Sequence, residues 1–420
     1  MSDRQLATRV VESLRQGLPP QRGIRTYAVG YESLLDGIAK RHLSGIEERG
    51  IIRFVSGSWG SGKTHFFRLL REQAFEQGCL VAGVELNVNE APLNKFEQVF
   101  HSIIQKVQSP GYYAGDVPPA AVPFGAVLGE ALVFLATGKH EQPQQISHED
   151  YTRACERLMA CQAIDIDFRK IVQKYWETYL PESPDVAVID QKRAELLQWF
   201  SGDGTAGHWR KQGINKVVDR SNAKLMLESL AAFAQLVGYR GIVILFDEAE
   251  MSFSVMKKSS LKEAHNNLLH LINNVDQIPG LFLIYATTPD FYTDPRHGIV
   301  IYGALAGRVG KPADRAPKAL DTVWNIDAVD FDLANYQAAA KKIRDIYTEA
   351  YPEAKDTSPT DSALDDFVAE LYEEHPQLAQ VRFWRVLITA TVRALDNALE
   401  GEAVPTPQVY HDVMESLRET

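Results

Sequence analysis

The sequence predicts an α/β protein in which helices cover both faces of a parallel sheet and a helical region follows. Two observations lead to this prediction. Over most of residues 51–330, short apolar runs alternate with segments of helical periodicity, and strands joined through helices pair in parallel. Residues 331–420 show helical periodicity alone, with a polar break at 353–361.

The expected strands are short and largely aliphatic, as strands buried on both faces are. They cover residues 51–55, 80–86, 242–246, 281–287 and 322–326. Helices are expected over residues 31–48, 65–77, 96–107, 224–236 and 261–274. The spacing of Leu6, Val10 and Leu14 predicts one more helix at the N-terminus, which Gly17-Leu18-Pro19-Pro20 ends.

Composition is that of an ordinary globular protein, with 45% hydrophobic residues among 420. The formal net charge of −11 disfavours a general nucleic-acid-binding protein, although a local basic patch stays compatible with it. The three cysteines form no C-x-x-C pair, which disfavours zinc and thioredoxin-type sites. The N-terminus lacks an apolar signal core, and prolines interrupt the longest apolar run, so we expect a cytoplasmic protein without a membrane span.

A glycine-rich loop follows the first expected strand and precedes a helix. Its residues, Gly57-Ser58-Trp59-Gly60-Ser61-Gly62-Lys63-Thr64, match the Walker A pattern G-x-x-x-x-G-K-[ST] in full. Glycines at these positions let successive backbone N–H groups surround a phosphate, and the helix adds its positive N-terminal end. Lys63 would contact the β- and γ-phosphates of ATP, and the Thr64 hydroxyl would bind Mg²⁺. The alternative is a chance glycine-rich turn.

Two acids follow the apolar strand at 242–246, as in a Walker B motif. Asp247 would hold the water shell of Mg²⁺, and Glu248 would act as the general base that deprotonates the attacking water. The alternative for Glu248 is a solvated acid at the start of a helix, where negative charge is favoured. The adjacent pair favours ATP hydrolysis over transfer of phosphate to a small molecule.

Three further side chains are candidates for contacts with the γ-phosphate or its attacking water. Thr288, just after the strand at 281–287, could position the water, with Thr287 as second choice and a turn before Pro289 as the alternative. Arg308 could act as an arginine finger on a neighbouring subunit or form a surface salt bridge. Near the start of a late helix, Arg382 is preferred over Arg385 as a nucleotide contact.

Several segments together resemble the BREX-system ATP-binding proteins of the short BrxD type. They are the opening at 11–20, Val29-Gly30-Tyr31-Glu32, the loop at 57–64, Val84-Glu85-Leu86-Asn87, Gly238-Tyr239-Arg240-Gly241 leading to Asp247-Glu248, Thr288-Pro289-Asp290-Phe291 and Tyr302-Gly303-Ala304-Leu305. The phosphate loop is generic, whereas the opening combined with the segments around residues 238 and 288 is more specific.

This resemblance implies an AAA+-like P-loop ATPase from a phage-defence locus, similar to the core of replication initiators and clamp loaders. It implies a core over residues 51–330, with a largely helical insertion at about 109–215 and a lid over 331–420. The segment 1–50 would close the nucleotide site, with Val29, Gly30 and Tyr31 beside the adenine. Other defence-system proteins, with a helicase among the candidates, would be partners.

We therefore expect Mg²⁺-dependent ATP binding and hydrolysis that drives a conformational switch or motor step in a bacterial or archaeal defence complex. Because sites of this kind usually lie between subunits, we expect a homo-oligomer whose assembly ATP promotes. One alternative is a nucleotide-dependent scaffold with little turnover that recruits a helicase or another defence protein. The other is a DNA loader or remodeller, so DNA binding stays open at this point.

Overall fold

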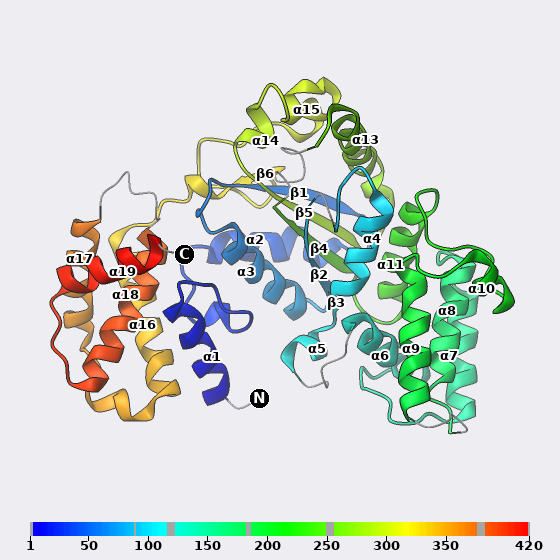
Figure 1. The fold of residues 1–420 in the computed structure, drawn as a ribbon, viewed down its shortest axis with the longest axis horizontal. Helices are drawn as coiled ribbons and strands as arrows, with labels where there is room; N and C mark the ends of the chain where they lie inside the picture. The colour runs from blue at the N-terminus through cyan, green and yellow to red at the C-terminus, as the bar shows by residue number, and fades with distance from the viewer. Residues whose placement is uncertain are drawn as a thin grey trace.

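The structure is a computed structural model of the 420-residue chain. It describes residues 3–87, 90–115, 122–181, 186–248, 256–375 and 383–418. A central sheet separates two groups of helices that lie at opposite ends of the molecule (Figure 1). The alternation of strands and helices expected from the sequence is confirmed for these residues.

Six strands form one sheet within the described residues, in the order β3-β2-β4-β5-β1-β6. Their bounds are β1 Ile51–Ser56, β2 Leu80–Glu85, β3 Val107–Gln108, β4 Ile242–Asp247, β5 Leu281–Thr287 and β6 Val323–Asn325. All neighbouring pairs are parallel except β2 and β3. The expected all-parallel sheet is therefore wrong at one edge. β3 follows the preceding helix directly and runs back along β2, which needs no crossover.

Strand order brings the functionally interesting strand ends together. β5 lies between β1 and β4, with Ser56 in register with Thr287 and Phe246 in register with Tyr285. All three strands run in the same direction, so their carboxyl ends meet at one edge of the sheet. The loop after β1 and the acids at the end of β4 consequently face the same space although 183 positions separate Thr64 from Asp247.

Helices cover both faces of the sheet because successive residues of each strand point to opposite faces. Alternate side chains of β1 show this, since Ile52 and Phe54 pack with one buried cluster and Ile51 and Val55 with another. The helices on the first face are α4 Phe96–Lys106, α11 Ala223–Leu236 and α13 Lys258–Asn274. Those on the second face include α2 Glu32–Arg41 and α3 Lys63–Glu76. The short helices α14 Asp290–Thr293 and α15 Gly303–Val309 follow β5.

Within 109–215, the described residues are mainly helical, and their helices stack beside α11 (Figure 1). They are α5 Pro110–Ala114, α6 Pro123–Thr137, α7 His148–Ala160, α8 Ile166–Glu177, α9 Val186–Phe200 and α10 Ala206–Lys211. Sequence periodicity missed α6 because this helix is buried on nearly all sides and shows no polar face. Helical periodicity runs through residues 151–180 without a break, whereas the structure has two helices there, α7 and α8, and the Asp165 side chain caps the N-terminus of α8.

The described C-terminal residues form four helices, and two of them, α16 and α18, lie against the N-terminal helix α1 Asp3–Arg15 (Figure 1). The four helices are α16 Leu333–Ala350, α17 Asp361–Glu374, α18 Phe383–Glu400 and α19 Thr406–Arg418. Arg15 makes a two-pronged contact with Asp396 of α18, through Nε at 2.9 Å and Nη2 at 2.8 Å. Tyr347 of α16 donates its hydroxyl to the same carboxylate at 2.7 Å. This contact fixes the N-terminal segment against α18.

None of the helices in the described part of the chain is long and apolar enough to cross a lipid bilayer.

His42, which follows α2, is a buried neutral histidine. Its Nε2 donates to the Ala319 carbonyl at 2.7 Å, whereas its buried Nδ1 has no partner within the described residues. Protonation of Nδ1 would place an uncompensated charge in the core. Burial accordingly lowers the pKa of His42 to about 4 from its usual 6.5.

We predict that this histidine makes stability dependent on pH. Between pH 6.5 and about 4 the unfolded chain binds the His42 proton more readily, so the free energy of unfolding should decrease as the pH is lowered, by about 2–3 kcal/mol from this residue. Urea unfolding at several pH values should show that the free energy of unfolding depends less steeply on pH in His42→Asn than in the wild type. The exposed His411→Asn is the matched control, and equal slopes for His42→Asn and wild type would contradict the prediction.

Candidate functional site

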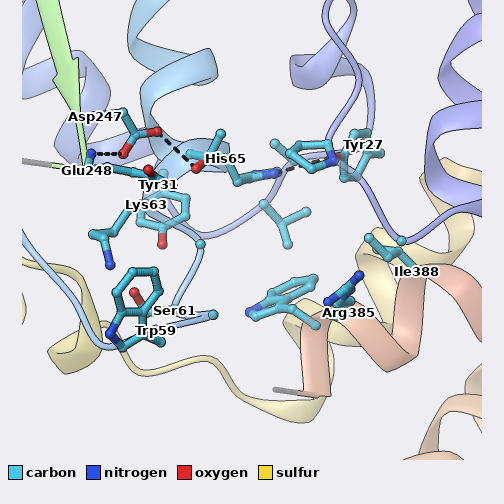
Figure 2. A pocket seen from close by; sticks show the side chains of 18 residues that line it. Tyr27, Tyr31, Trp59, Ser61, Lys63, His65, Asp247, Glu248, Arg385 and Ile388 are labelled. Atoms are coloured by element: carbon cyan, nitrogen blue, oxygen red, sulfur yellow. Dashed lines mark hydrogen bonds between the residues drawn. The ribbon is translucent and has the colours of Figure 1, made fainter. Parts of the chain in front are cut away.

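A cavity of about 390 Å³ lies at the carboxyl edge of β1 and β4. This volume falls in the range of small-molecule sites, roughly 300–1,000 Å³. Figure 2 shows its two ends, with Lys63, Asp247 and Glu248 at one end and Tyr27, Arg385 and Ile388 at the other. The full lining comprises Gly17, Pro19, Tyr27, Ala28, Val29, Tyr31, Trp59, Gly60, Ser61, Gly62, Lys63, Thr64, His65, Asp247, Glu248, Trp384, Arg385 and Ile388. The lining therefore combines one polar and one largely apolar end.

The loop after β1 has the backbone that its glycines allow. Gly60 and Gly62 adopt positive φ angles of 73° and 93°, which L side chains rarely adopt, and Gly62 is the N-cap of α3. The N-terminus of α3 consequently opens into the cavity with Lys63 and Thr64 as its first residues. The buried Ser61 hydroxyl has no hydrogen-bond partner within the described residues. This end can supply main-chain donors, a hydroxyl and a cation to an anionic ligand.

The first part of the loop is held by the protein itself. The Gly57 N–H donates to the Thr287 carbonyl at 3.1 Å, and the Ser58 N–H and hydroxyl donate to Asp327 Oδ2 at 2.7 and 2.6 Å. Lys63 Nζ donates to the carbonyls of Gly57 and Ser58 at 2.8 and 3.2 Å. Of the predicted loop residues, Gly57 and Ser58 therefore support the loop, and the residues from Trp59 to Thr64 line the cavity.

Trp59 covers the lysine on its solvent side. Its side chain is 61% exposed, and its ring centroid lies 5.4 Å from Lys63 Nζ, a distance typical of a cation–π contact. Figure 2 shows the indole next to the lysine, at the polar end of the cavity. Lys63 is itself buried, so its ammonium group has few solvent contacts in this arrangement.

The acidic pair Asp247-Glu248 at the end of β4 lies against the phosphate loop, as the sequence predicts. Thr64 Oγ1 donates to Asp247 Oδ2 at 3.1 Å, and the Glu248 N–H donates to Asp247 Oδ1 at 3.0 Å. Both oxygens of the Asp247 carboxylate are thus oriented by neighbours. Residues 59–64 and 247–248, which are distant in sequence, meet in one cavity.

Glu248 has an unusual backbone and an altered acidity. Its φ of 54° is the one positive value found among the non-glycine residues described. Such strain is often found at functional sites. Partial burial, and secondly the charges of Asp247 and Glu85, raise the pKa of the Glu248 carboxyl above its usual 4.5. A raised pKa makes a carboxylate a stronger base once it is ionised.

The opposite end of the cavity is aromatic and mostly apolar. Tyr27 and His65 are in T-shaped contact at 5.6 Å between ring centroids, and the Tyr27 hydroxyl lies 3.3 Å from His65 Nδ1. Burial lowers the pKa of His65 to about 4, so the imidazole is neutral near pH 7. Tyr31 is buried and packs against Phe66 at 5.1 Å. A flat apolar ring would be well accommodated here.

Arg385 of α18 provides the cation at this end. Its Nε is buried and has no hydrogen-bond partner within the described residues, and a Cβ at Gly17 would approach that nitrogen to 3.2 Å. Figure 2 shows Arg385 reaching from its helix toward the cavity. The preferred arginine of the sequence analysis, Arg382, lies outside the described residues.

The segment before β1 lies where it was expected, but Gly30 does not line the cavity. Val29 and Tyr31 do line it. Gly30 has a φ of 84°, and a Cβ there would lie 2.4 Å from Cε1 of Phe331. The structure therefore gives Gly30 a packing role against the segment that precedes α16.

Three further candidates lie outside the cavity lining. Thr288 is buried at the end of β5, and its carbonyl accepts from the Phe291 N–H at 3.1 Å. The Thr287 hydroxyl already donates to the Val55 carbonyl at 3.0 Å and pairs with Tyr292 at 2.8 Å. Arg308 is exposed on α15. Roles for Thr288 and Arg308 stay predictions.

Sequence reasoning missed several residues of the site, chiefly Tyr27, His65, Trp384 and Asp327. His65 follows the Walker A pattern directly, a position that the pattern leaves unspecified. Asp327 follows β6, whose carboxyl end lies at the same edge of the sheet as that of β1. Its position just after an expected parallel strand was the available signal.

Comparison with known proteins gives one match. The family model of the BREX system ATP-binding protein BrxC/D matches residues 3–414. The chain belongs to this family. No curated protein and no solved structure showed significant similarity to it. As a member of the BREX ATP-binding family, the protein has a role in BREX phage defence that involves ATP binding, and other proteins of that system are its partners.

We predict that Gly30→Ala destabilises the fold through the clash with Phe331. The positive φ and the 2.4 Å approach should together lower the free energy of unfolding by about 1–3 kcal/mol, measured by urea denaturation. The control is Gly45→Ala, because a Cβ at Gly45 meets nothing within 4 Å. If Gly30→Ala is as stable as Gly45→Ala, the packing role assigned to Gly30 is wrong.

Proposed function

We propose that this BREX ATP-binding protein is a Mg²⁺-dependent ATPase whose hydrolysis cycle switches the conformation of a defence complex. One observation carries the proposal: Lys63, Thr64, Asp247 and Glu248 line the same cavity, with Thr64 and Asp247 joined by a 3.1 Å hydrogen bond. Together these residues supply a cation for the phosphates, ligands for a metal ion and a general base within one site.

ATP would bind with its triphosphate at the polar end and its adenine at the aromatic end. The N–H groups at the N-terminus of α3, from Gly62 to Thr64, and the buried Ser61 hydroxyl would donate to phosphate oxygens. The carbonyls of Gly57 and Ser58 hold Lys63 within reach of the cavity, so phosphate binding would exchange these contacts for stronger charge-assisted ones. Arg385 would approach the nucleotide from α18, taking the role predicted for an arginine of the lid.

The donor set also fits Mg²⁺. This ion takes oxygen ligands and is usually bound through one or two carboxylates together with substrate phosphates. The Thr64 hydroxyl and the Asp247 carboxylate are such ligands, already adjacent. The described residues contain no group of three or more His, Cys, Asp or Glu side chains placed to hold a metal ion, so the phosphates would supply the rest. Bound there, Mg²⁺ would neutralise charge on the phosphates.

Hydrolysis would depend on Glu248. Its raised pKa and its place beside Asp247 suit a base that accepts a proton from the attacking water. Thr288 could orient that water only if the loop after β5 moves toward the cavity, since it does not line it here. The products would then differ from ATP in charge at the polar end, which is the change that a switch requires.

The walls of the cavity come from two separate parts of the fold, so nucleotide binding would be coupled to the position of α18 relative to the sheet. Trp384, Arg385 and Ile388 belong to α18, whereas the phosphate loop belongs to the sheet. A nucleotide that contacts both favours the arrangement in which they are close.

Self-association is part of the proposal, with exposed Arg308 as the residue that would reach the site of a neighbouring copy. A scaffold that binds ATP without hydrolysing it is the second candidate, because its cavity would look the same.

We predict that Glu248→Gln keeps ATP binding and loses turnover. Removal of the base should lower kcat by about 10²–10⁴-fold, while ATP affinity stays within a few-fold of wild type. Phosphate release and binding of a fluorescent ATP analogue measure the two quantities, with exposed Glu48→Gln as control. If wild-type protein binds ATP but releases no more phosphate than Glu248→Gln, the scaffold candidate is correct.

We predict that Arg308→Ala lowers turnover without weakening ATP binding. An arginine acting across a subunit boundary stabilises charge mainly in the transition state, so kcat should fall by about 10²-fold or more. Steady-state phosphate release should be measured at protein concentrations where light scattering detects the oligomer. Lys311→Ala removes another exposed cation close by in the sequence, and its kcat should be close to that of the wild type. Equal losses of affinity and turnover in Arg308→Ala would rule out the finger.

A further inference from the structure

A second cavity, of about 560 Å³, lies on the other side of the phosphate loop. Gly60, Ser61 and Trp384 line both cavities. The remaining wall comes from the segment after β6 and from α16, α17 and α18. It comprises Ile326, Asp327, Val329, Asp330, Phe331, Tyr336, Tyr372, Glu373, His375 and Phe383. Nothing in the predicted nucleotide chemistry uses this cavity.

The charged residues of this wall exclude a phosphate ligand. Three carboxylates, those of Asp327, Asp330 and Glu373, line the cavity, and no lysine or arginine does so among the residues described. A triphosphate would meet like charge here, whereas a cation would meet opposite charge. The second cavity is thus complementary in charge to the first.

Aromatic rings form most of the remaining wall and contact one another. Tyr336 lies at 4.7 Å from Trp384 and 4.8 Å from Phe383, measured between ring centroids. Tyr372 lies 5.0 Å from Phe383, and Phe331 lies 5.0 Å from Trp384. Tyr372 is 46% exposed, so part of this residue remains accessible at this wall. Aromatic faces attract cations, most strongly where water is excluded.

We propose that this cavity, lined by aromatic rings and acids, binds an arginine side chain of a partner protein. A guanidinium group is planar, so it can stack on an aromatic ring while its N–H groups pair with a carboxylate in a two-pronged contact. Lysine has a compact, strongly hydrated ammonium group and cannot do both in the same way. Asp330 and Glu373 supply the carboxylates, and Tyr372 supplies the accessible ring.

The cavity is linked to the phosphate loop by direct contacts. Asp327 accepts two hydrogen bonds from Ser58, and Ser61 lies in both linings. An arginine in the second cavity would therefore change the charge beside the loop that holds Lys63. Binding at either cavity would then alter affinity at the other by the same factor. This coupling, unlike arginine binding itself, rests on the proposed function.

The test uses full-length protein and the peptide acetyl-Gly-Arg-Gly-amide in a ligand-observed NMR titration at low salt. The control peptide carries citrulline, which keeps the shape of arginine without its charge. The Arg peptide should bind about tenfold more tightly than the citrulline peptide. Equal binding of the two peptides, or no saturable binding of the Arg peptide, would overturn the proposal.

Protein variants locate the binding. Neutralising two carboxylates in Asp330→Asn/Glu373→Gln should weaken the Arg peptide about tenfold, and Tyr372→Leu should weaken it several-fold. Glu374→Gln changes an exposed acid on the same helix that does not line the cavity, and its affinity should stay within about twofold of wild type. Equal effects of Glu373→Gln and Glu374→Gln would show that only the general negative charge of the surface attracts the peptide.

A last titration is made with a non-hydrolysable ATP analogue and Mg²⁺ present. A changed affinity for the Arg peptide supports coupling, and an unchanged affinity at saturating analogue overturns it. If the analogue itself does not bind, the proposed function fails while the peptide results still decide whether arginine is recognised.

Discussion

The site depends on the parallel pairing of β1, β5 and β4. Parallel strands end at the same edge, and this places the loop after β1 opposite the acids after β4. The hydrogen bond between Thr64 and Asp247 closes this arrangement. Because β5 lies between β1 and β4, there is room for a ligand between the phosphate loop and the acids, while Thr64 and Asp247 still reach each other. A different strand order would leave Lys63 and Glu248 on unrelated surfaces.

The N-terminal segment and α18 together form the apolar end of the cavity. Arg15 and Asp396 join the N-terminal helix to α18, and both segments then contribute to the apolar end of the cavity. The charged contact is supported by the Tyr347 hydroxyl, so the carboxylate has several donors. The polar end of the cavity therefore lies at the edge of the sheet, and the apolar end lies between segment 17–31 and α18.

Much of the fold could be predicted because strands and helices of this kind carry strong periodic signals. The bounds of β1, β2, β4 and β5 follow closely from apolar runs. Elements without a periodic pattern were not found: β3 has two residues, and α6 is buried on nearly all sides. Neither a hydrophobic alternation nor a polar face exists in such segments for sequence analysis to detect.

The site divides in the same way. The phosphate loop and its acids have fixed local spacing, which sequence reveals. Asp327 has no such mark, since it holds Ser58 from 269 positions away. Arg385 lines the cavity, whereas the preferred Arg382 lies outside the described residues, and Gly30 was assigned to the nucleotide although Phe331 explains it. These assignments require tertiary packing, which local sequence does not encode.

The distribution of cavity walls along the chain has a consequence for synthesis on the ribosome. In chain order the phosphate loop and α3 come before most of the strands, whereas Trp384, Arg385 and Ile388 of α18 come after all six described strands. During that interval the wall that contains Tyr27 and Tyr31 packs against α3 but lacks its α18 counterpart. A nascent chain can thus fold its sheet while the α18 side of the pocket is still missing, and it gains a complete pocket only after α18 has been made.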